Sequence, residues 1–106
     1  MTYKTLYSSA AKTDLKEAVL YISNELKNPT SANALLDAVN EELNTLSLFP
    51  YAHNIIANKF LSPYEFRFVK VKNYIAVYKV NETEKTIYIV RFLYNKRDWT
   101  EILKTI

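Results

Sequence analysis

The sequence predicts a single α+β domain in which a helical hairpin covers one face of a small antiparallel sheet. Between residues 10 and 46, apolar side chains recur at the three- and four-residue spacing of amphipathic helices. Residues 66–93 carry three short runs rich in β-branched and aromatic side chains, with turns between them. The length of 106 residues suits one two-layer core. We therefore expect residues 1–106 to form one domain.

The first half of the chain is predicted to be a strand followed by two helices. Residues 2–7 are rich in tyrosine and threonine and form the first strand. A helix follows over residues 10–27, and its apolar face comprises Leu15, Ala18, Val19, Ile22 and Leu26. The connector to the second helix is short, so the two helices are expected to be antiparallel.

Two prolines mark the ends of these helices. The dipeptide at 28–29, Asn-Pro, ends the first helix because proline disfavours helical geometry in the residue before it. Thr30 or Ser31 is expected to cap the second helix, and the Phe-Pro dipeptide at 49–50 stops it. The apolar stripe of the second helix comprises Ala32, Leu35, Leu36, Val39, Leu43 and Leu46.

The second half is predicted to be a loop, a three-stranded meander and a short closing helix. The strands are placed at residues 66–71, 74–80 and 86–93. Residues 51–63 form the loop. Because the sequence has no glycine, asparagine is expected at left-handed turn positions. Asp98 is expected to cap the closing helix, and the predicted aromatic core comprises Phe66, Phe68, Phe92 and Trp99.

Composition excludes several kinds of site. The chain has no cysteine, which excludes disulfides and thiolate metal sites. A single histidine, His53, argues against a histidine zinc site or a catalytic triad. Glycine-rich phosphate loops are absent from the sequence, so neither a cofactor nor a metal is expected. No apolar run approaches the roughly 20 residues of a membrane helix, so we expect a cytoplasmic protein without a membrane partner.

Positive charge is concentrated in the second half of the chain. Residues 1–53 carry four lysines and six carboxylates, whereas residues 54–106 carry ten lysines and arginines and five carboxylates. A polyanion would be attracted to the second half. The candidate functional residues there are Arg67, Arg91, Tyr94 and Arg97, with Lys70, Lys72 and Lys96 as further phosphate contacts.

The chemistry of these side chains suits a nucleic acid. Arginine binds phosphate through its planar fork, and tyrosine can stack on a base or transfer a proton. Arg91 lies within an apolar strand, where burying an unpaired charge is costly, so we expect it to face an open groove. Structural alternatives stay open. Arg67 would then pair with Glu65 or a helix carboxylate, and Tyr94 would pack.

Four segments resemble the RelE/ParE superfamily, the toxins of bacterial type II toxin–antitoxin modules, also called plasmid stabilisation proteins. They are "DLKEAVLYISNEL", "LSLFP", "FRFVKVKNYIAVYKV" and "IYIVRFLYNKRDWTEIL", in the order that these toxins have. The resemblance implies a cognate antitoxin as partner, and either a homodimer or a heterotetramer with that antitoxin.

The resemblance leaves the target open. RelE-like relatives are mRNA interferases, endoribonucleases that cleave ribosome-bound mRNA, whereas ParE-like relatives poison DNA gyrase without a nuclease site. RNA cleavage would use Arg67, Arg91, Tyr94 and Arg97 as catalytic residues, and it is the interpretation that we favour from the sequence. Two departures weaken it: there is no histidine near the end of the chain, and the lysine cluster of RelE-like toxins is thin here. A module that only binds an antitoxin is the third alternative.

Overall fold

The computed structural model of the protein describes residues 2–56 and 61–104 and shows the predicted α+β fold. A π-helical turn, Tyr21–Glu25, continues the first helix, and a 3₁₀ turn, Ser62–Tyr64, precedes the second strand. The main elements are β1 (Lys4–Tyr7), α1 (Ser9–Leu20), α2 (Pro29–Leu48), β2 (Arg67–Val71), β3 (Tyr74–Asn81), β4 (Thr86–Tyr94) and α3 (Trp99–Leu103).

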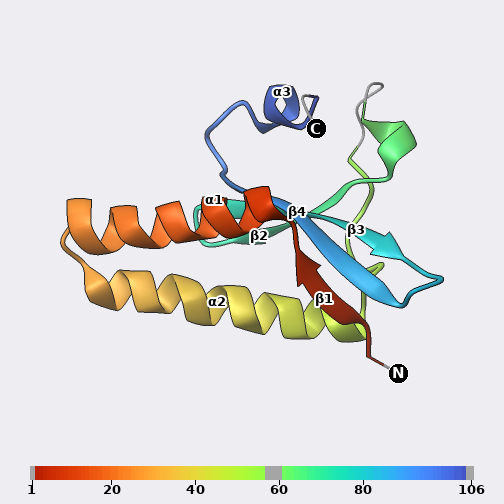
Figure 1. Ribbon diagram of the computed structural model, residues 1–106, viewed down its shortest axis with the longest axis horizontal. Coiled ribbons are helices and arrows are strands. Elements are labelled where there is room, and N and C mark those ends of the chain that lie inside the picture. Colours follow the sequence, from red (N-terminus) through yellow and green to blue (C-terminus); the bar gives the residue numbers. More distant parts are fainter. Residues whose placement is uncertain (1, 57–60, 105–106) are drawn as a thin grey trace.

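The four strands form one sheet in the order β1-β4-β3-β2 (Figure 1). β2, β3 and β4 are the predicted antiparallel meander, whereas β1 runs parallel to β4. The pairing of β1 with β4 ends at Tyr7 and Ile89. Beyond that point, the chain that enters α1 follows the edge of β4, and the backbone N–H of Ser8 donates to the carbonyl oxygen of Ile89 at 2.9 Å.

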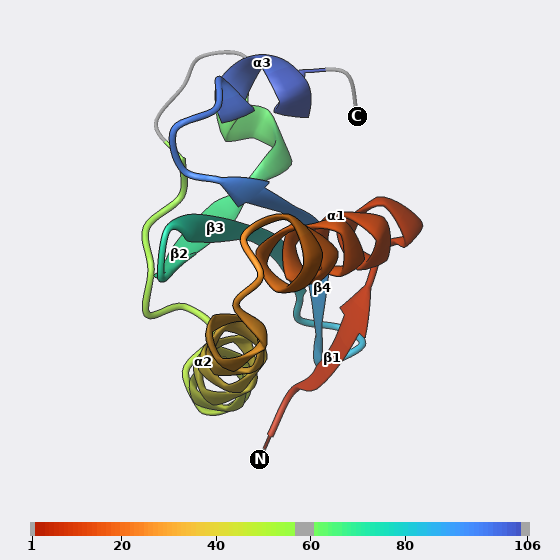
Figure 2. The ribbon, with the colours of Figure 1, turned by 90° about the vertical axis from the view of Figure 1, so that its left-hand side faces the viewer.

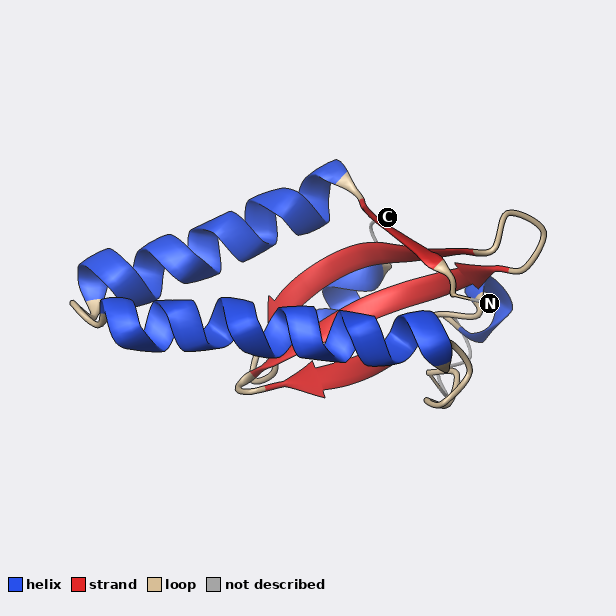
Figure 3. Ribbon diagram, turned by 90° about the horizontal axis from the view of Figure 1, so that it is seen from below, coloured by secondary structure: helices blue, strands red, loops and turns tan. Residues whose placement is uncertain are grey.

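The helical hairpin covers one face of the sheet, as predicted (Figures 1 and 3). Leu35 and Val39 of α2 are buried with Tyr78 and Ile89 of the sheet. Of the predicted apolar face of the first helix, Ala18 is buried in the same core and Leu15, Val19 and Ile22 are partly buried against it. The prediction is wrong for Leu26, which follows the end of the helix and is exposed. In Figure 3 the two helices lie antiparallel, and the end at which they are joined extends beyond the sheet.

The opposite face of the sheet is covered in part by α3 and the 3₁₀ turn (Figure 2). A smaller apolar cluster lies there and comprises Ile56, Leu61, Phe66, Ile75, Val77, Leu93 and Leu103. A register shift between Val77 and Tyr78, which pair with Arg91 and Ile89, leaves Val90 as an extra residue in β4. The bulge allows Ile89 and Phe92, which are three positions apart in β4, to join the same cluster.

The caps of the helices differ in one place from the prediction. Asn28, rather than Thr30 or Ser31, is the N-cap of α2, and its side chain accepts a hydrogen bond from the backbone N–H of Ser31 at 3.1 Å. Pro29 is the first helical residue, a position where proline is favoured because its missing N–H needs no partner. The predicted caps were therefore placed too late. Asp98 caps α3 as predicted.

Among the described residues, the left-handed positions are occupied by Lys27, Glu65, Lys72 and Lys85, with φ between 50° and 56°. The expectation of asparagine is wrong at these four positions. Asparagine side chains instead accept backbone hydrogen bonds next to two of them: Asn28 as a helix cap and Asn81 from the N–H of Glu84 at 3.0 Å.

Two of the four aromatic core predictions are confirmed. Phe66 and Phe92 are buried, whereas Phe68 is 38% exposed because it lies on the edge strand β2. The side chain of Trp99 lies outside the described part of the chain. The predicted loop contains the 3₁₀ turn and one bridge, between Ile55 and Arg67, and its residues 57–60 are not among those described.

Candidate functional site

Arg91 is held in an ion pair by α1. Its guanidinium donates to both carboxylate oxygens of Asp14, from Nε at 2.6 Å and from Nη2 at 2.9 Å. Asp14 also accepts the backbone N–H of Phe92 at 3.0 Å, on the part of the β4 edge that β1 does not reach. The hydrogen bond with Asp14 raises the pKa of Arg91. The expectation that Arg91 faces an open groove is wrong, because its paired side chain is only 20% exposed.

Arg67 is held at a different part of the sheet. Its guanidinium donates to the carbonyl oxygen of His53 and lies 5.0 Å from the centre of the Tyr51 ring. It pairs across the sheet with Tyr78, whereas Tyr94 pairs with Tyr74, four positions away along β3. At the rise of a β-strand, four residues span about 13 Å. The fold therefore does not bring Arg67 and Tyr94 into one site.

A polar cluster centred on Glu82 is connected to Arg67 through Tyr51, whose ring lies against the guanidinium and whose hydroxyl bonds to Glu82. The hydroxyls of Tyr3 and Tyr51 both donate to Oε2 of Glu82 at 2.6 Å, and Lys85 pairs with the same carboxylate. The bonds from Lys85 and the two tyrosines lower the pKa of Glu82 to about 2. The bond to Glu82 raises the pKa of Tyr51 to about 12. Sequence reasoning missed this cluster because its members are far apart along the chain.

Three of the predicted cations lie together at the end of the sheet. The turn that contains Lys72 and the turn that contains Lys96 and Arg97 are joined, because the backbone N–H of Asn95 donates to the carbonyl oxygen of Asn73 at 2.9 Å. All three cationic residues are exposed. Lys70 is separate from them, since it alternates with the buried residues of β2 and so lies on the face away from the hairpin.

Beside these cations, a pocket of about 770 Å³ lies between the hairpin tip and the ends of β3 and β4. We call it the tyrosine pocket. Tyr74 stacks on Phe92 with ring centres 5.0 Å apart and meets Tyr94 edge-on at 5.5 Å. Tyr94 and Arg97 line this pocket. The other lining residues come from the helical hairpin, from the start of β3 with the turn before it, and from the end of β4. They are Asp14, Glu17, Ala18, Tyr21, Ile22, Leu26, Asn28, Ser31, Asn73, Tyr74, Phe92 and Leu93.

The pocket combines aromatic walls with polar groups. Burial, and then the neighbouring Tyr94 and Tyr21, raise the pKa of Tyr74, so its hydroxyl is protonated at neutral pH. Within the described part of the chain, Glu17 forms no salt bridge. Glu17 and Tyr21 were not predicted. Their four-residue spacing places them on one helix face, but nothing in the sequence indicates which sheet residues they meet.

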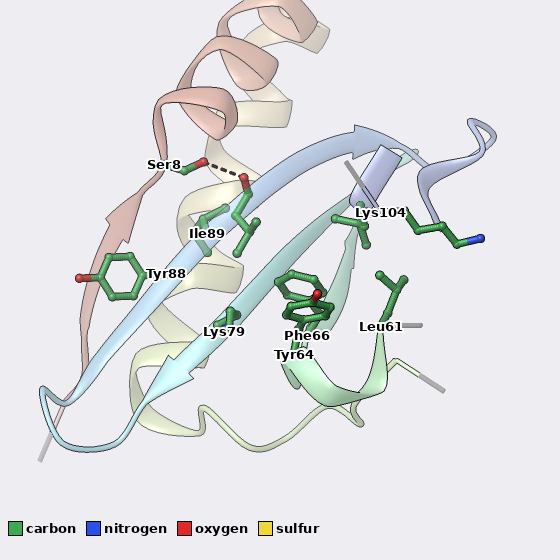
Figure 4. A pocket seen from close by; sticks show the side chains of 10 residues that line it. Ser8, Leu61, Tyr64, Phe66, Lys79, Tyr88, Ile89 and Lys104 are labelled. Atoms are coloured by element: carbon green, nitrogen blue, oxygen red, sulfur yellow. Dashed lines mark hydrogen bonds between the residues drawn. The ribbon is translucent and has the colours of Figure 1, made fainter. Parts of the chain in front are cut away.

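A second pocket, of about 690 Å³, lies on the opposite face of the sheet (Figure 4). Leu61, Phe66 and Leu103 line it, and Tyr64 stacks on Phe66 at 5.7 Å. Among the described residues, the charged side chains that line it are those of Lys79 and Lys104. This second pocket is therefore more apolar than the tyrosine pocket and includes none of the predicted site residues.

The described residues hold no group of three or more histidine, aspartate or glutamate side chains that could bind a metal ion. None of the described helices is both long and apolar enough to cross a membrane.

Comparison with known proteins identifies the family. The model of the family described as ParE toxin of type II toxin–antitoxin system, parDE, matches residues 6–99. Among solved structures, the crystal structure of the toxin–antitoxin complex RelBE2 from Mycobacterium tuberculosis contains a chain of similar fold, with a TM-score of 0.62. The two chains are 15% identical, and the match covers 89% of this chain and 99% of that chain. No curated protein sequence matches. The protein thus belongs to the ParE toxin family, within the RelE/ParE superfamily of type II toxin–antitoxin toxins.

Proposed function

We propose that the protein arrests bacterial growth by poisoning DNA gyrase in the cytoplasm, and that a cognate antitoxin neutralises it. Membership of the ParE toxin family supports this proposal, since ParE-like toxins act on gyrase and need no nuclease site. The observation that carries it is the separation of Arg67 from Tyr94 along the sheet, together with the pairing of Arg91 with Asp14. RNA cleavage would depend on these three residues.

RNA cleavage needs its acid, base and phosphate-binding groups within hydrogen-bond reach of one reacting phosphate. Here the Arg91 guanidinium is bound by Asp14, and Arg67 is bound by the His53 carbonyl and covered by Tyr51. Both arginines therefore have structural partners. A toxin that acts by contact with a protein does not require them to converge.

Ribosome-dependent mRNA cleavage is the second candidate, and one observation favours it. Tyr94 and Arg97 line the same pocket, and Lys72 and Lys96 lie in the two adjoining turns. In that case Tyr94 would transfer the proton and Arg97 would bind the phosphate, with Arg91 as a structural residue.

Induction of the toxin without its antitoxin tests the proposal. We expect growth arrest, loss of supercoiling by purified gyrase in the presence of the toxin, and no new 5′ ends in a ribosome-bound reporter mRNA. Tyr94→Phe is a suitable comparison because it keeps the ring and removes the hydroxyl. A gyrase poison should tolerate this change, whereas a nuclease that uses Tyr94 should lose activity. Cleavage of the reporter with unaffected gyrase would overturn the proposal.

A separate experiment tests the proposal that a cognate antitoxin neutralises the protein. We expect the adjoining reading frame to encode a short acidic protein that restores growth when it is coexpressed, because the toxin is basic in its second half. Continued arrest in the presence of that protein would contradict the assignment of a cognate antitoxin, whatever the target.

A further inference from the structure

We propose that the tyrosine pocket holds one unpaired base of a single-stranded nucleic acid, with Tyr21 as a stacking wall and Glu17 as an acceptor for the base's exocyclic amine. The inference goes beyond gyrase poisoning and does not depend on it. It assigns a ligand to the pocket by the pocket's own chemistry, and either target complex, gyrase on DNA or the ribosome on mRNA, contains nucleic acid.

The walls of the pocket suit a flat aromatic ligand. Tyr74, Phe92 and Tyr94 form one aromatic wall on the sheet, with ring centres 5.0 and 5.5 Å apart. Tyr21 comes from the helical hairpin and is 53% exposed. Tyr21 and Tyr74 line the same pocket, one from the hairpin and the other from the sheet. Aromatic side chains in such an arrangement stack on unpaired bases with little regard to sequence.

The backbone at Tyr21 departs from a regular α-helix. Tyr21 is the first residue of the π-turn, and its carbonyl oxygen accepts the N–H of Leu26, five residues on, at 3.1 Å. Single π-turns in α-helices are frequent at functional sites. Ile22 and Leu26, from the same turn, also line the pocket. The irregular turn thus supplies two of the pocket's lining residues, Tyr21 and Ile22, and its C-cap Leu26 is a third.

The charges around the pocket fit a nucleotide better than a free anion or a free cation. Asp14 lines the pocket and is paired with Arg91, which is not a lining residue, whereas Glu17 forms no salt bridge in the described part of the chain. A carboxylate accepts hydrogen bonds from the amino group of cytosine or adenine. Outside the pocket, Lys72 and Lys96 lie in the two joined turns, where they can contact the phosphates on either side of the bound base.

Binding of short single-stranded oligonucleotides to the free, full-length toxin tests the proposal. Fluorescence anisotropy would be measured with a DNA, an RNA of the same sequence and an abasic DNA of equal length. We expect the base-containing strands to bind about tenfold more tightly than the abasic strand, because one stacked base contributes roughly that much. A preference between DNA and RNA would identify which nucleic acid the pocket prefers.

Tyr21→Ala should weaken binding of the base-containing strand about tenfold and leave binding of the abasic strand unchanged. Tyr64→Ala is the matched control, since both tyrosines are 53% exposed and Tyr64 lines the other pocket. Oligo(dC) should bind more tightly than oligo(dT), which lacks an amine, and Glu17→Leu should abolish that preference.

Equal affinity for base-containing and abasic strands would overturn the proposal, and so would equal effects of Tyr21→Ala and Tyr64→Ala. These results are independent of the supercoiling and cleavage assays. If the toxin poisons gyrase but binds no base, only the base-binding proposal is wrong. If it binds a base but does not affect gyrase, only the proposed target is wrong.

Discussion

Asp14 and Arg91 join α1 to the middle of β4 through two hydrogen bonds of 2.6 and 2.9 Å, across 77 positions of sequence. Both side chains are mostly buried, at 11% and 20% exposed. The same carboxylate accepts the N–H of Phe92, so it closes the sheet edge that the short strand β1 leaves open. An arginine that sequence alone places among the catalytic candidates is therefore part of the fold.

Removal of either partner should leave an uncompensated charge. We expect Asp14→Ala and Arg91→Ala each to lower the free energy of unfolding by about 3 kcal/mol, the usual cost of breaking a largely buried pair. The double variant should lose less than the two single losses together, because neither charge then remains. Urea denaturation of the four proteins measures this coupling. Additive losses would show that the pair contributes no interaction energy of its own.

The Glu82 cluster predicts a loss of stability in acid. The folded-state pKa of Glu82 is lowered from 4.5 to about 2, so its contribution is present above pH 4.5 and is lost as the pH falls towards 2. The melting temperature of the wild-type protein should therefore fall more across this window than that of Glu82→Gln. Glu84→Gln, a neighbouring exposed carboxylate, is the control and should keep the wild-type slope. Parallel curves for wild type and Glu82→Gln would contradict the assignment.

The strands could be predicted from the sequence because their signal is local. Alternation and turn residues placed β2, β3 and β4 within one residue of their observed ends. The cap of α2 was misplaced because Asn28, Thr30 and Ser31 are all possible N-caps. Asn28 is the cap because Pro29 directly follows it as the first helical residue.

The candidate site could be predicted only in part. Tyr94, Lys96 and Arg97 are close in sequence and remain together in the fold. By contrast, the partners of Arg67 and Arg91 come from other elements, and so do the helical residues of the tyrosine pocket. Sequence spacing contains no information about such contacts, because they are set by how the hairpin lies on the sheet.

Replacement of Lys27 should stabilise the folded protein without changing a residue of any proposed site. It adopts φ of 51°, a left-handed conformation that costs a residue with a Cβ atom roughly 1 kcal/mol. Lys27→Gly should therefore raise the free energy of unfolding by up to about 1 kcal/mol. Lys16→Gly, within α1, should lower it by a similar amount because glycine is a poor helix former. Chemical denaturation of both variants checks the contrast, and a destabilised Lys27→Gly would contradict it.

The final prediction separates the structural from the catalytic role of Arg91. A buried ion pair can often be replaced by apolar residues of similar volume with little loss of stability. The double variant Asp14→Leu/Arg91→Met should therefore fold, and it should still arrest growth if Arg91 only supports the fold. Arg91→Met alone should lose toxicity in proportion to its loss of folded protein, measured by circular dichroism and by the soluble fraction. If Arg91 instead acts on a reacting phosphate, no change at Asp14 can replace its charge. If the double variant folds but fails to arrest growth, Arg91 has a functional role, and Asp14 is the residue that positions its side chain.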